Sequence, residues 1–491
     1  MRSFGISIAI AAALAAFPAL AAPKDTVSIG VTLEPPGLDP TSGAAAAIGE
    51  IVHYNIFEGL TKINEDFAIT PLLAEKWSFS PDLKTLTFNL KKGVKFQDGE
   101  PFSSKDVKFS FERYAAKDST NKEKAFFASI QAIDASDPDV VTLTFKEPSF
   151  DALFHLGQNT AVILDEKSAA NEANQPIGTG PYKLSAWNKG ASATLDKLDG
   201  FRDAGKIAIA HATFKFISDP SAQAAALLAG DVDAFPRGPI QALPQFQGDP
   251  RFQVLIGGTE GKTILAMNNK KKPLDDLKVR QAIAYAIDRK AIIDGAMNGL
   301  GTPIGSHLTP NDPGYVDLTG QYPHDPEKSK ALLKAAGVKL PLELTLTLPP
   351  PDYARKGGEI VASELAEVGI QAKIENVEWA QWLSNVYKDK NYDLTIISHV
   401  EPLDIGIYSK PGYYFNYDDP KFDAIIARLS TAPDIDGYKK ALVEAQHKLA
   451  DDCVNAFLFQ LPNVVIADAH LMGLWKNAPI FANDLSALSW K

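Results

Sequence analysis

The sequence is nearly devoid of cysteine, and its few histidines are scattered. Cys453 is the single cysteine among 491 residues, so an internal disulfide is excluded and the fold has to be stable without covalent cross-links. It lies in an apolar, helix-like stretch, which favours a buried, unreactive thiol over a nucleophile. The eight histidines do not cluster at the spacing of metal ligands. We therefore expect no bound metal and no cofactor.

Long apolar runs are also missing, because nothing after the N-terminal segment approaches the roughly 20 uncharged residues that a membrane span needs. The N-terminal segment itself has the pattern of a secretory signal peptide. Met1 and Arg2 give a positive start, residues 6–17 are apolar, and small residues precede Ala21. We expect residues 1–21 to be a signal peptide cleaved after Ala21. No cysteine follows at the position of a lipid anchor, so we expect a free periplasmic protein.

Basic residues and catalytic motifs are both in short supply. The chain has 49 basic and 60 acidic residues, and this net charge of −11 argues against nucleic acid or an anionic membrane as a partner. We find no G-x-S-x-G elbow, no H-E-x-x-H pair and no phosphate-binding loop. Paired carboxylates are common in any acidic chain and do not discriminate. We expect no enzyme, and a secreted hydrolase remains a remote alternative.

The patterns that are present change along the chain. The mature length exceeds what one hydrophobic core usually sustains and predicts two or three domains. Up to about Phe145, short alternating strands and one helix that starts near Ser103 indicate an α+β region. After about Thr263, amphipathic helices alternate with single strands, and the apolar spacing predicts one helix over residues 276–296.

A β-α-β-α-β pattern follows in the second half. Strands are predicted at Leu342–Leu348, Ile370–Val377 and Tyr392–Ser398, with a helix over residues 358–368 between the first two. Helical crossovers make such strands parallel, and ligands bind beyond the carboxyl ends of parallel strands. We therefore single out the loop PPPDYARKGG, which contains Tyr353 and Arg355, and the loop HVEPLDIGIYSKPGYY, which contains His399, Glu401 and Asp404.

Six segments in the same order resemble one known family. They include YNIFEGLTKIN with the long stretch up to FSFER, IGTGPYKLSAW, DPSAQAAALLAGDVDAF, MNNKKKPLDDLKVRQAIAYAIDRKAII, NYDDPKFDAII and AQHKLADDCVNAFLFQ. Together they cover nearly all of the mature chain and resemble the peptide, opine and nickel-binding family of bacterial ABC-importer solute-binding proteins. Each segment also has a structural interpretation, which we favour: for example, Gly178 and Gly180 are expected to adopt backbone conformations that other residues resist.

The resemblance implies an α/β, two-lobed periplasmic binding protein fold with an extra α+β subdomain in the first lobe. On this sequence, lobe I would comprise residues 22–53, 177–260 and 465–491, the extra subdomain residues 54–176, and lobe II residues 261–464. The chain would cross between the lobes near residues 257–262 and 461–467. The implied partners are a small-molecule or peptide ligand and the permease subunits of an ABC importer in the inner membrane, which cytoplasmic ATPase subunits energise. The protein is expected to be a monomer.

The resemblance also implies how a ligand would be held. Peptide binders of the family hold the ligand's carboxylate with an arginine and its ammonium with an aspartate, which correspond to Arg355 and Asp404. Such groups form strong charged hydrogen bonds. The sequence departs from the family around Asp404, where Glu401 competes for the role. The alternative for Arg355 is a surface salt bridge.

Aromatic and acidic residues near the same loops complete the candidate ligand-binding set. These are Tyr353, His399, Trp379 and Glu34, with core packing as the alternative for Trp379 and a solvated turn for Glu34. A peptide or peptide-like solute is the favoured ligand. Another solute class, such as an opine, a metal chelate held through His399, haem or a sugar, remains the alternative.

Overall fold

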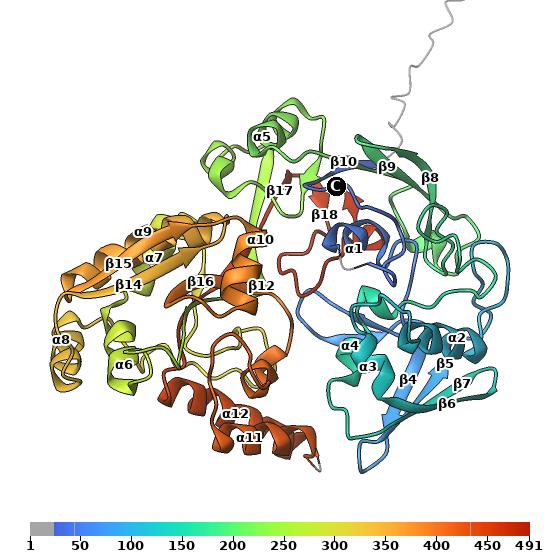
Figure 1. Ribbon diagram of the computed structural model, residues 1–491. Helices are drawn as coiled ribbons and strands as arrows, with labels where there is room; N and C mark the ends of the chain where they lie inside the picture. Colours follow the sequence, from blue (N-terminus) through green and yellow to red (C-terminus); the bar gives the residue numbers. More distant parts are fainter. Residues whose placement is uncertain (1–23, 44, 433) are drawn as a thin grey trace, which may run out of the picture.

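The computed structural model describes residues 24–43, 45–432 and 434–491, and it forms two lobes (Figure 1). The signal-peptide prediction lies outside the described residues. One lobe contains α1 to α4 and the strands β1 to β10, and the other contains α6 to α12 with β14 to β16. No helix in the described part of the chain has the length and apolarity needed to cross a membrane.

A single 11-stranded sheet passes through both lobes. Its order is β15-β14-β16-β12-β17-β11-β1-β10-β9-β8, and the short β13 also pairs with β17. β1 is parallel to β10 and β11, β14 is parallel to β15 and β16, and the remaining pairs are antiparallel. The strands of this sheet are β1 (Thr26–Val31), β8 (Tyr182–Asn188), β9 (Ser192–Lys197), β10 (His211–Phe216), β11 (Ala234–Phe235), β12 (Phe252–Met267), β13 (Thr302–Pro303), β14 (Leu342–Leu348), β15 (Ile370–Asn376), β16 (Leu394–His399) and β17 (Asn455–Asp468).

The first lobe also contains a separate antiparallel sheet, in the order β4-β5-β7-β6. Its strands alternate buried and exposed side chains because one face packs on the core. Helix α2 begins with a capping box. The Ser103 side chain accepts a hydrogen bond from a backbone N–H of the first helical turn, and the Asp106 side chain accepts one from the backbone N–H of Ser103. This region consists of β4 (Ala74–Phe79), β5 (Thr85–Leu90), α2 (Ser104–Ala115), α3 (Lys124–Ser129), β6 (Ile130–Asp137), β7 (Val140–Phe145) and α4 (Ala152–His155).

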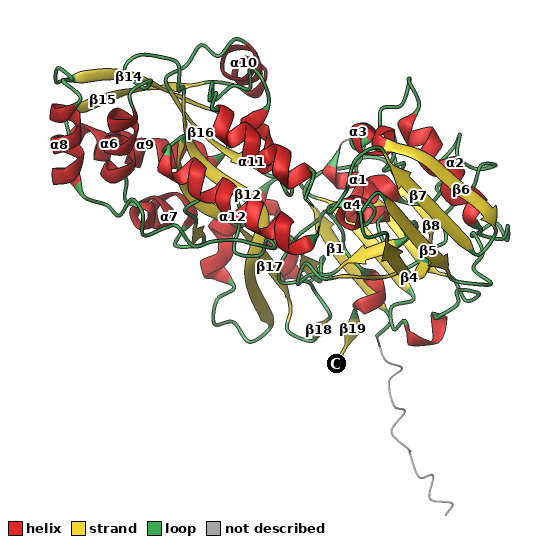
Figure 2. Ribbon diagram, turned by 90° about the horizontal axis from the view of Figure 1, so that it is seen from below, coloured by secondary structure: helices red, strands yellow, loops and turns green. Residues whose placement is uncertain are grey.

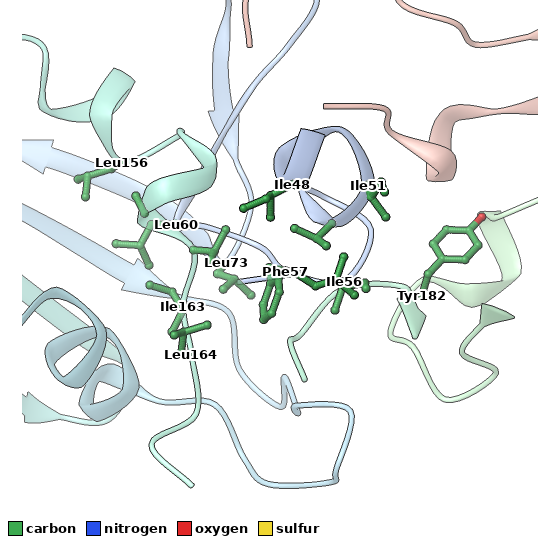
Figure 3. Packing of buried hydrophobic residues seen from close by; sticks show 14 of the residues in the cluster. Ile48, Ile51, Ile56, Phe57, Leu60, Leu73, Leu156, Ile163, Leu164 and Tyr182 are labelled. Carbon is green, nitrogen blue, oxygen red and sulfur yellow. The ribbon is translucent and has the colours of Figure 1, made fainter. Parts of the chain in front are cut away.

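The core of the first lobe joins this sheet to the large one. Figure 3 shows Ile48 and Ile51 of α1 (Ala46–Val52) packing near Phe57 and Leu164. The same core includes Tyr182 of β8, so the separate sheet is not an independent body. The remaining elements of this lobe are β2 (Thr61–Ile63), β3 (Ile69–Pro71), α5 (Pro220–Ala229), β18 (Leu471–Met472) and β19 (Ser489–Trp490).

The second lobe has its own two cores on either side of β12, β14 and β16. Cys453 is buried beside them, and burial raises the pKa of its thiol to about 12, so the thiol is unreactive. The helices of this lobe are α6 (Leu277–Ala286), α7 (Arg289–Met297), α8 (Pro326–Ala335), α9 (Asp352–Glu367), α10 (Trp379–Trp382), α11 (Pro420–Ser430) and α12 (Ile435–Asp451).

β12 and β17 carry the chain from one lobe to the other (Figure 2). Residues 252–258 of β12 pair with residues 462–468 in the first lobe, and residues 262–266 pair with residues 455–460 in the second. The register shifts between Gly258 and Lys262, which marks a bulge between the two halves of the ribbon. The predicted crossing segments 257–262 and 461–467 lie in these two strands.

Three local predictions are corrected by the structure. The helix predicted over residues 276–296 is two helices, because Asp288 accepts hydrogen bonds from backbone N–H groups and starts α7. The helix predicted to start at residue 358 starts at Asp352, so Tyr353 and Arg355 belong to α9 and not to a loop. Gly178 and Gly180 do not have positive φ; a Cβ atom there would lie 2.1 Å from Ile56 O and 2.4 Å from Asn55 O, so close packing requires glycine.

Candidate binding cleft

A cleft of about 700 Å³ separates the two lobes. From the first lobe it is lined by Gly43, Ala45, Ala46, Lys122 and Glu123, by residues within 151–160 and by residues 479–481, and residues within 379–387 and 397–414 supply side chains from the second. The volume lies in the range of small-molecule sites. No described residue of the separate sheet's strands or of β12 and β17 belongs to the lining.

Exposed apolar side chains are concentrated in this cleft. Trp379, Leu383, Tyr387, Val400 and Phe481 line it and remain 40–52% exposed. Contiguous exposed apolar side chains lower the solubility of a protein, so such a group indicates a binding surface. Four of the five belong to the second lobe.

The wall contributed by the second lobe is aromatic. Trp379 follows β15 and meets Trp382 edge to face, with ring centroids 5.9 Å apart. Tyr387 continues the row and lies 5.7 Å from Tyr413. Trp382 is fixed from behind because its indole N–H donates to Thr395 Oγ1 at 3.0 Å. Rigid rings give apolar contact area with little conformational entropy to lose on binding.

A buried ionic network supports this wall from below. Lys262 of β12 is fully buried, and its Nζ lies 3.0 Å from Asp404 Oδ1 and donates to the carbonyl oxygen of Glu401. His307 Nε2 lies 3.0 Å from the same Asp404 oxygen. Burial alone would raise the pKa of Asp404, but His307 and Lys262 hold it well below its usual range. Asp404 is therefore ionised and already paired.

His399 belongs to the same wall and is neutral. Burial, with nearby His307 as a smaller cause, lowers the pKa of His399 to about 3. Its Nε2 lies 2.8 Å from the hydroxyl of Tyr414, and the two rings are stacked. Its Nδ1 lies 3.7 Å from Asp404 Oδ2, so this second carboxylate oxygen faces a neutral group.

His307, His399 and Asp404 place three potential metal-ligand atoms within 4.8 Å of one another. The ammonium of Lys262 occupies the same surroundings at 3.0 Å from Asp404. A divalent cation would meet this fixed positive charge without water to screen it. The donor set fits an internal ion network better than a metal site.

The wall contributed by the first lobe is charged and polar. His155 in α4 lies between two carboxylates, with Nδ1 3.0 Å from Glu123 Oε2 and Nε2 3.3 Å from Asp151 Oδ2. Burial alone would lower the pKa of His155, but these hydrogen bonds outweigh it and raise the pKa to about 9. We name these residues the His155 triad. Its charges are largely compensated within the protein.

Three polar atoms of the cleft are buried and have no partner among the described residues. They are Gln158 Nε2 and Thr160 Oγ1 on the first lobe and Ser398 Oγ on the second. Buried polar atoms are rarely left without a hydrogen bond, and exceptions indicate a missing partner. Both walls therefore carry polar groups without a partner among the described residues.

Three of the six candidate residues line the cleft, namely Trp379, His399 and Asp404. Tyr353 lies behind the wall, where its hydroxyl accepts a hydrogen bond from Ser398 N at 3.3 Å. Glu34 ties its loop to the β8–β9 hairpin by accepting hydrogen bonds from Trp187 Nε1 and Gly190 N, both at 3.0 Å.

Arg355 lies outside the cleft lining and forms a salt bridge within its own lobe. Its Nη2 donates to Glu378 Oε1 at 3.1 Å and to Val377 O at 3.3 Å. Arg355 and Asp404 thus have separate partners and do not pair with each other. The salt bridge with Glu378 ties the first turn of α9 to the segment that precedes Trp379.

Sequence reasoning missed the first-lobe wall and the network below the second. The Asp151–His155 spacing of four residues on one helix was a usable signal for the His155 triad. Lys262 fell in a predicted crossing segment, but nothing in the sequence indicates that its side chain is buried against Asp404. His307 comes from a long connection without regular structure, where patterns of hydrophobicity carry no information.

The model of the bacterial extracellular solute-binding proteins, family 5, middle region, matches residues 68–402 of this chain. The chain belongs to this family. As a family 5 solute-binding protein it is similar to the glutathione-binding protein GsiB of Salmonella choleraesuis, with 30% identity over 390 residues, 77% of this chain and 74% of the relative. GsiB of Escherichia coli K12 is 30% identical over 397 residues, 78% of this chain and 75% of the relative.

Solved structures agree with this assignment at the level of the fold. The Agrobacterium tumefaciens protein AgaA in complex with agropinic acid superimposes with a TM-score of 0.77 at 27% identity, covering 95% of this chain and 99% of AgaA. The Listeria monocytogenes protein CtaP reaches a TM-score of 0.86 at 21% identity, covering 96% and 100%. This family 5 protein therefore has the two-lobed fold of periplasmic binding proteins.

Proposed function

We propose that this solute-binding protein captures a small peptide or peptide-like solute in the cleft between its lobes. It then delivers the solute to the membrane permease of an ABC importer that cytoplasmic ATPase subunits energise. The observation that carries the proposal is the cleft itself, which has unpartnered polar atoms on both walls and exposed aromatic rings on one. The 30% identical relatives are named as glutathione-binding proteins, and glutathione is a tripeptide.

Capture would depend on closure of the lobes about the β12–β17 ribbon. We propose the division into lobe I (22–53, 177–260 and 465–491), the extra subdomain (54–176) and lobe II (261–464), with the bulge between Gly258 and Lys262 at the boundary. A ligand that touches both lobes stabilises the closed form by its differential affinity for it. The permease would then distinguish loaded from empty protein by shape.

Within the cleft, we propose Trp379, His399 and Asp404 as direct ligand contacts. Trp379 offers a ring face, and the second oxygen of Asp404 is available to a ligand N–H because its first oxygen holds Lys262 and His307. Tyr353 and Arg355 would act from behind, by holding Ser398 and the segment before Trp379. Glu34 would hold a loop of the first lobe.

We also propose that the protein is exported by a signal peptide cleaved after Ala21, works in the periplasm as a monomer and turns over no substrate. The acidic composition and the family membership support this reading. Intact-mass spectrometry of protein from the periplasmic fraction tests the cleavage site. Recovery of an unchanged peptide after prolonged incubation tests the absence of catalysis.

The central experiment is titration calorimetry of the purified mature protein with glutathione and with a neutral tripeptide. We expect saturable binding of at least one of them, and a thermal melt should show a melting temperature that rises with the logarithm of ligand concentration. Mass spectrometry of solutes that co-purify from the natural host provides an independent readout. Absence of peptide binding together with recovery of a non-peptide solute would overturn the proposal.

An opine is the second candidate ligand, because AgaA, which is 27% identical, was solved with agropinic acid. Opines share carboxylate and amine groups with peptides but lack a chain of amide bonds. Titration with agropinic acid under the same conditions separates the two. Tighter binding of agropinic acid than of any di- or tripeptide would favour an opine.

A further inference from the structure

Residues 476–478, which we name the clasp, pack on the ribbon where its bulge begins. In β12, the backbone N–H of Gly258 donates a hydrogen bond to Asn477 Oδ1 at 2.9 Å, and Gly258 O accepts one from Ala478 N at 2.9 Å. In β17, Asn463 Nδ2 donates to the carbonyl oxygen of the first clasp residue at 3.0 Å. The clasp therefore contacts both strands that carry the chain from one lobe to the other.

The ribbon has a glycine at the point where the clasp approaches it. A Cβ atom at Gly257 would lie 2.2 Å from Lys476 O, and φ is not positive there, so the close approach is what requires glycine. The regular pairing of β12 with β17 stops at Gly258 and resumes at Lys262. The clasp therefore holds the ribbon at the first-lobe edge of the bulge.

The clasp leads directly into the cleft. Residues 479–481 follow it and belong to the cleft lining, and the side chain of Phe481 is 40% exposed there. On the other side, Arg237 Nη2 donates to Ile480 O at 3.3 Å, and the Arg237 guanidinium lies 5.0 Å from the centroid of the Phe481 ring. Phe481 is thus supported both by the clasp and by Arg237.

We infer that Asn477 is a positioning residue for ligand capture, because its side chain fixes the clasp to the ribbon and thereby holds Phe481 in place in the cleft. A ring that is already in position gives apolar contact area at little cost in conformational entropy. Bending of the ribbon beyond Gly258 would leave Phe481 in place while the aromatic wall of the second lobe approaches it. This role rests on the proposed function, since it assumes that the ligand binds beside Phe481.

Fluorine NMR of the ligand-free mature protein tests the clasp directly, with 4-fluorophenylalanine placed at position 481 alone. N477A removes the side-chain anchor of the clasp, so the resonance should shift or broaden. N477D keeps an oxygen that accepts from Gly258 N and should restore the wild-type resonance. N64A is the matched control, because Asn64 also lies in the first lobe and its side chain bonds Ala68 O in a turn outside the cleft lining.

A second variant displaces the clasp from the side of the ribbon. G257A places a Cβ atom against the backbone oxygen of Lys476, so the clasp has to move and the resonance of the label at 481 should change as in N477A. G205A is the control, because a Cβ atom at Gly205 would meet nothing within 4 Å. A label at Phe422, which is buried in the second lobe, should keep its resonance in both variants.

Titration calorimetry with glutathione as the probe connects the clasp to binding. N477A and F481A should each weaken binding about threefold to tenfold, as expected when an aromatic contact is lost or misplaced. The double variant should bind no more weakly than F481A, because Asn477 acts through this ring. N477D and N64A should match the wild type.

The outcomes separate the clasp from the proposed function. If the label at 481 is unchanged in N477A and G257A, Arg237 suffices to hold Phe481 and the role of Asn477 is wrong, whatever the ligand. A change of the labels at both 481 and Phe422 would show a general loss of packing and would also contradict it, as would additive losses of affinity in N477A and F481A. If glutathione does not bind but N477A moves the ring, the clasp is supported and the failure concerns the proposed ligand.

Discussion

The two walls of the cleft are built on different principles. On the first lobe, the His155 triad pairs one imidazolium with two carboxylates at the cleft, which leaves one net negative charge. On the second lobe, the surface is aromatic, and the charges of Lys262 and Asp404 lie beneath it. The comparison indicates that the second wall is a rigid recognition surface whose shape depends on a buried network. The first wall is electrostatic and sensitive to pH.

Removal of the buried cation should have the largest effect. K262M leaves Asp404 ionised in a dry environment, and breaking a buried ion pair from one side costs about 3–5 kcal/mol of stability. Urea unfolding of the ligand-free protein measures this loss. The control is K373M, because Lys373 forms an exposed pair with Glu375 and such pairs contribute at most about 1 kcal/mol. Equal stability of K262M and K373M would contradict the proposed role of the network.

Much of the fold could be predicted because its signals are local. The strand at Leu342–Leu348 and the β-α-β-α-β order follow from apolar periodicity and turn residues, and the structure has them as β14, α9, β15, α10 and β16. The boundary at Asp288 was missed because an apolar face continues across it, and only the capping bond of that aspartate separates α6 from α7. The early start of α9 was missed because PPPDYARKGG was interpreted as a loop and the helix was predicted to begin only at Gly358. In the structure, a Cβ atom at Gly358 would lie 2.3 Å from Leu348 Cδ1, so packing explains the glycine.

The site was only partly predictable because it is assembled from distant segments. Trp379, His399 and Asp404 could be singled out since they follow the carboxyl ends of β15 and β16. The residues that set the charge state of Asp404 are Lys262, in the crossing strand β12, and His307, in an irregular connection. Lys262 lies 142 residues and His307 lies 97 residues before Asp404 in the sequence. No periodic pattern connects residues that are so far apart.

A pH series should separate the first wall from the second. Because the folded pKa of His155 is raised to about 9 from about 6.5, its contribution to stability is fully present below pH 6.5 and is lost as the pH rises through 9. We expect a loss on the order of 2 kcal/mol between pH 6.5 and pH 9.5. The free energy of unfolding of H155Q should lack this pH-dependent contribution. The difference in free energy of unfolding between the wild type and H155Q should therefore become smaller at high pH. A constant difference across the series would show that the triad is not ionised as described.

Replacement of the exposed tryptophan should affect binding without affecting the fold. Trp379 is 42% exposed and lines the cleft, so W379A should weaken ligand binding about tenfold, within the range for an aromatic contact. The free energy of unfolding should change by less than about 0.5 kcal/mol, as for most surface substitutions. L340A is the control, because Leu340 is 50% exposed and lies outside the cleft lining. Equal affinities of W379A and L340A would remove Trp379 from the recognition surface.

The smallest expected effect concerns an aromatic contact between the two lobes that forms without a ligand. Phe150, which precedes α4, stacks on Tyr438 of α12 with ring centroids 4.9 Å apart and an interplanar angle of 26°. Because this contact joins the two lobes, we expect it to favour their close approach by the roughly 0.5–1.5 kcal/mol of an aromatic pair. F150A should therefore weaken ligand binding about threefold to tenfold and enlarge the radius of gyration of the ligand-free protein in X-ray scattering. Y438F keeps the ring and should match the wild type in both measurements. If F150A binds ligand as tightly as Y438F does, the Phe150–Tyr438 stack does not contribute to closure, and the approach of the two walls depends on the ligand, the ribbon and the remaining contacts between the lobes, such as the hydrogen bond from Gln241 to Asp352.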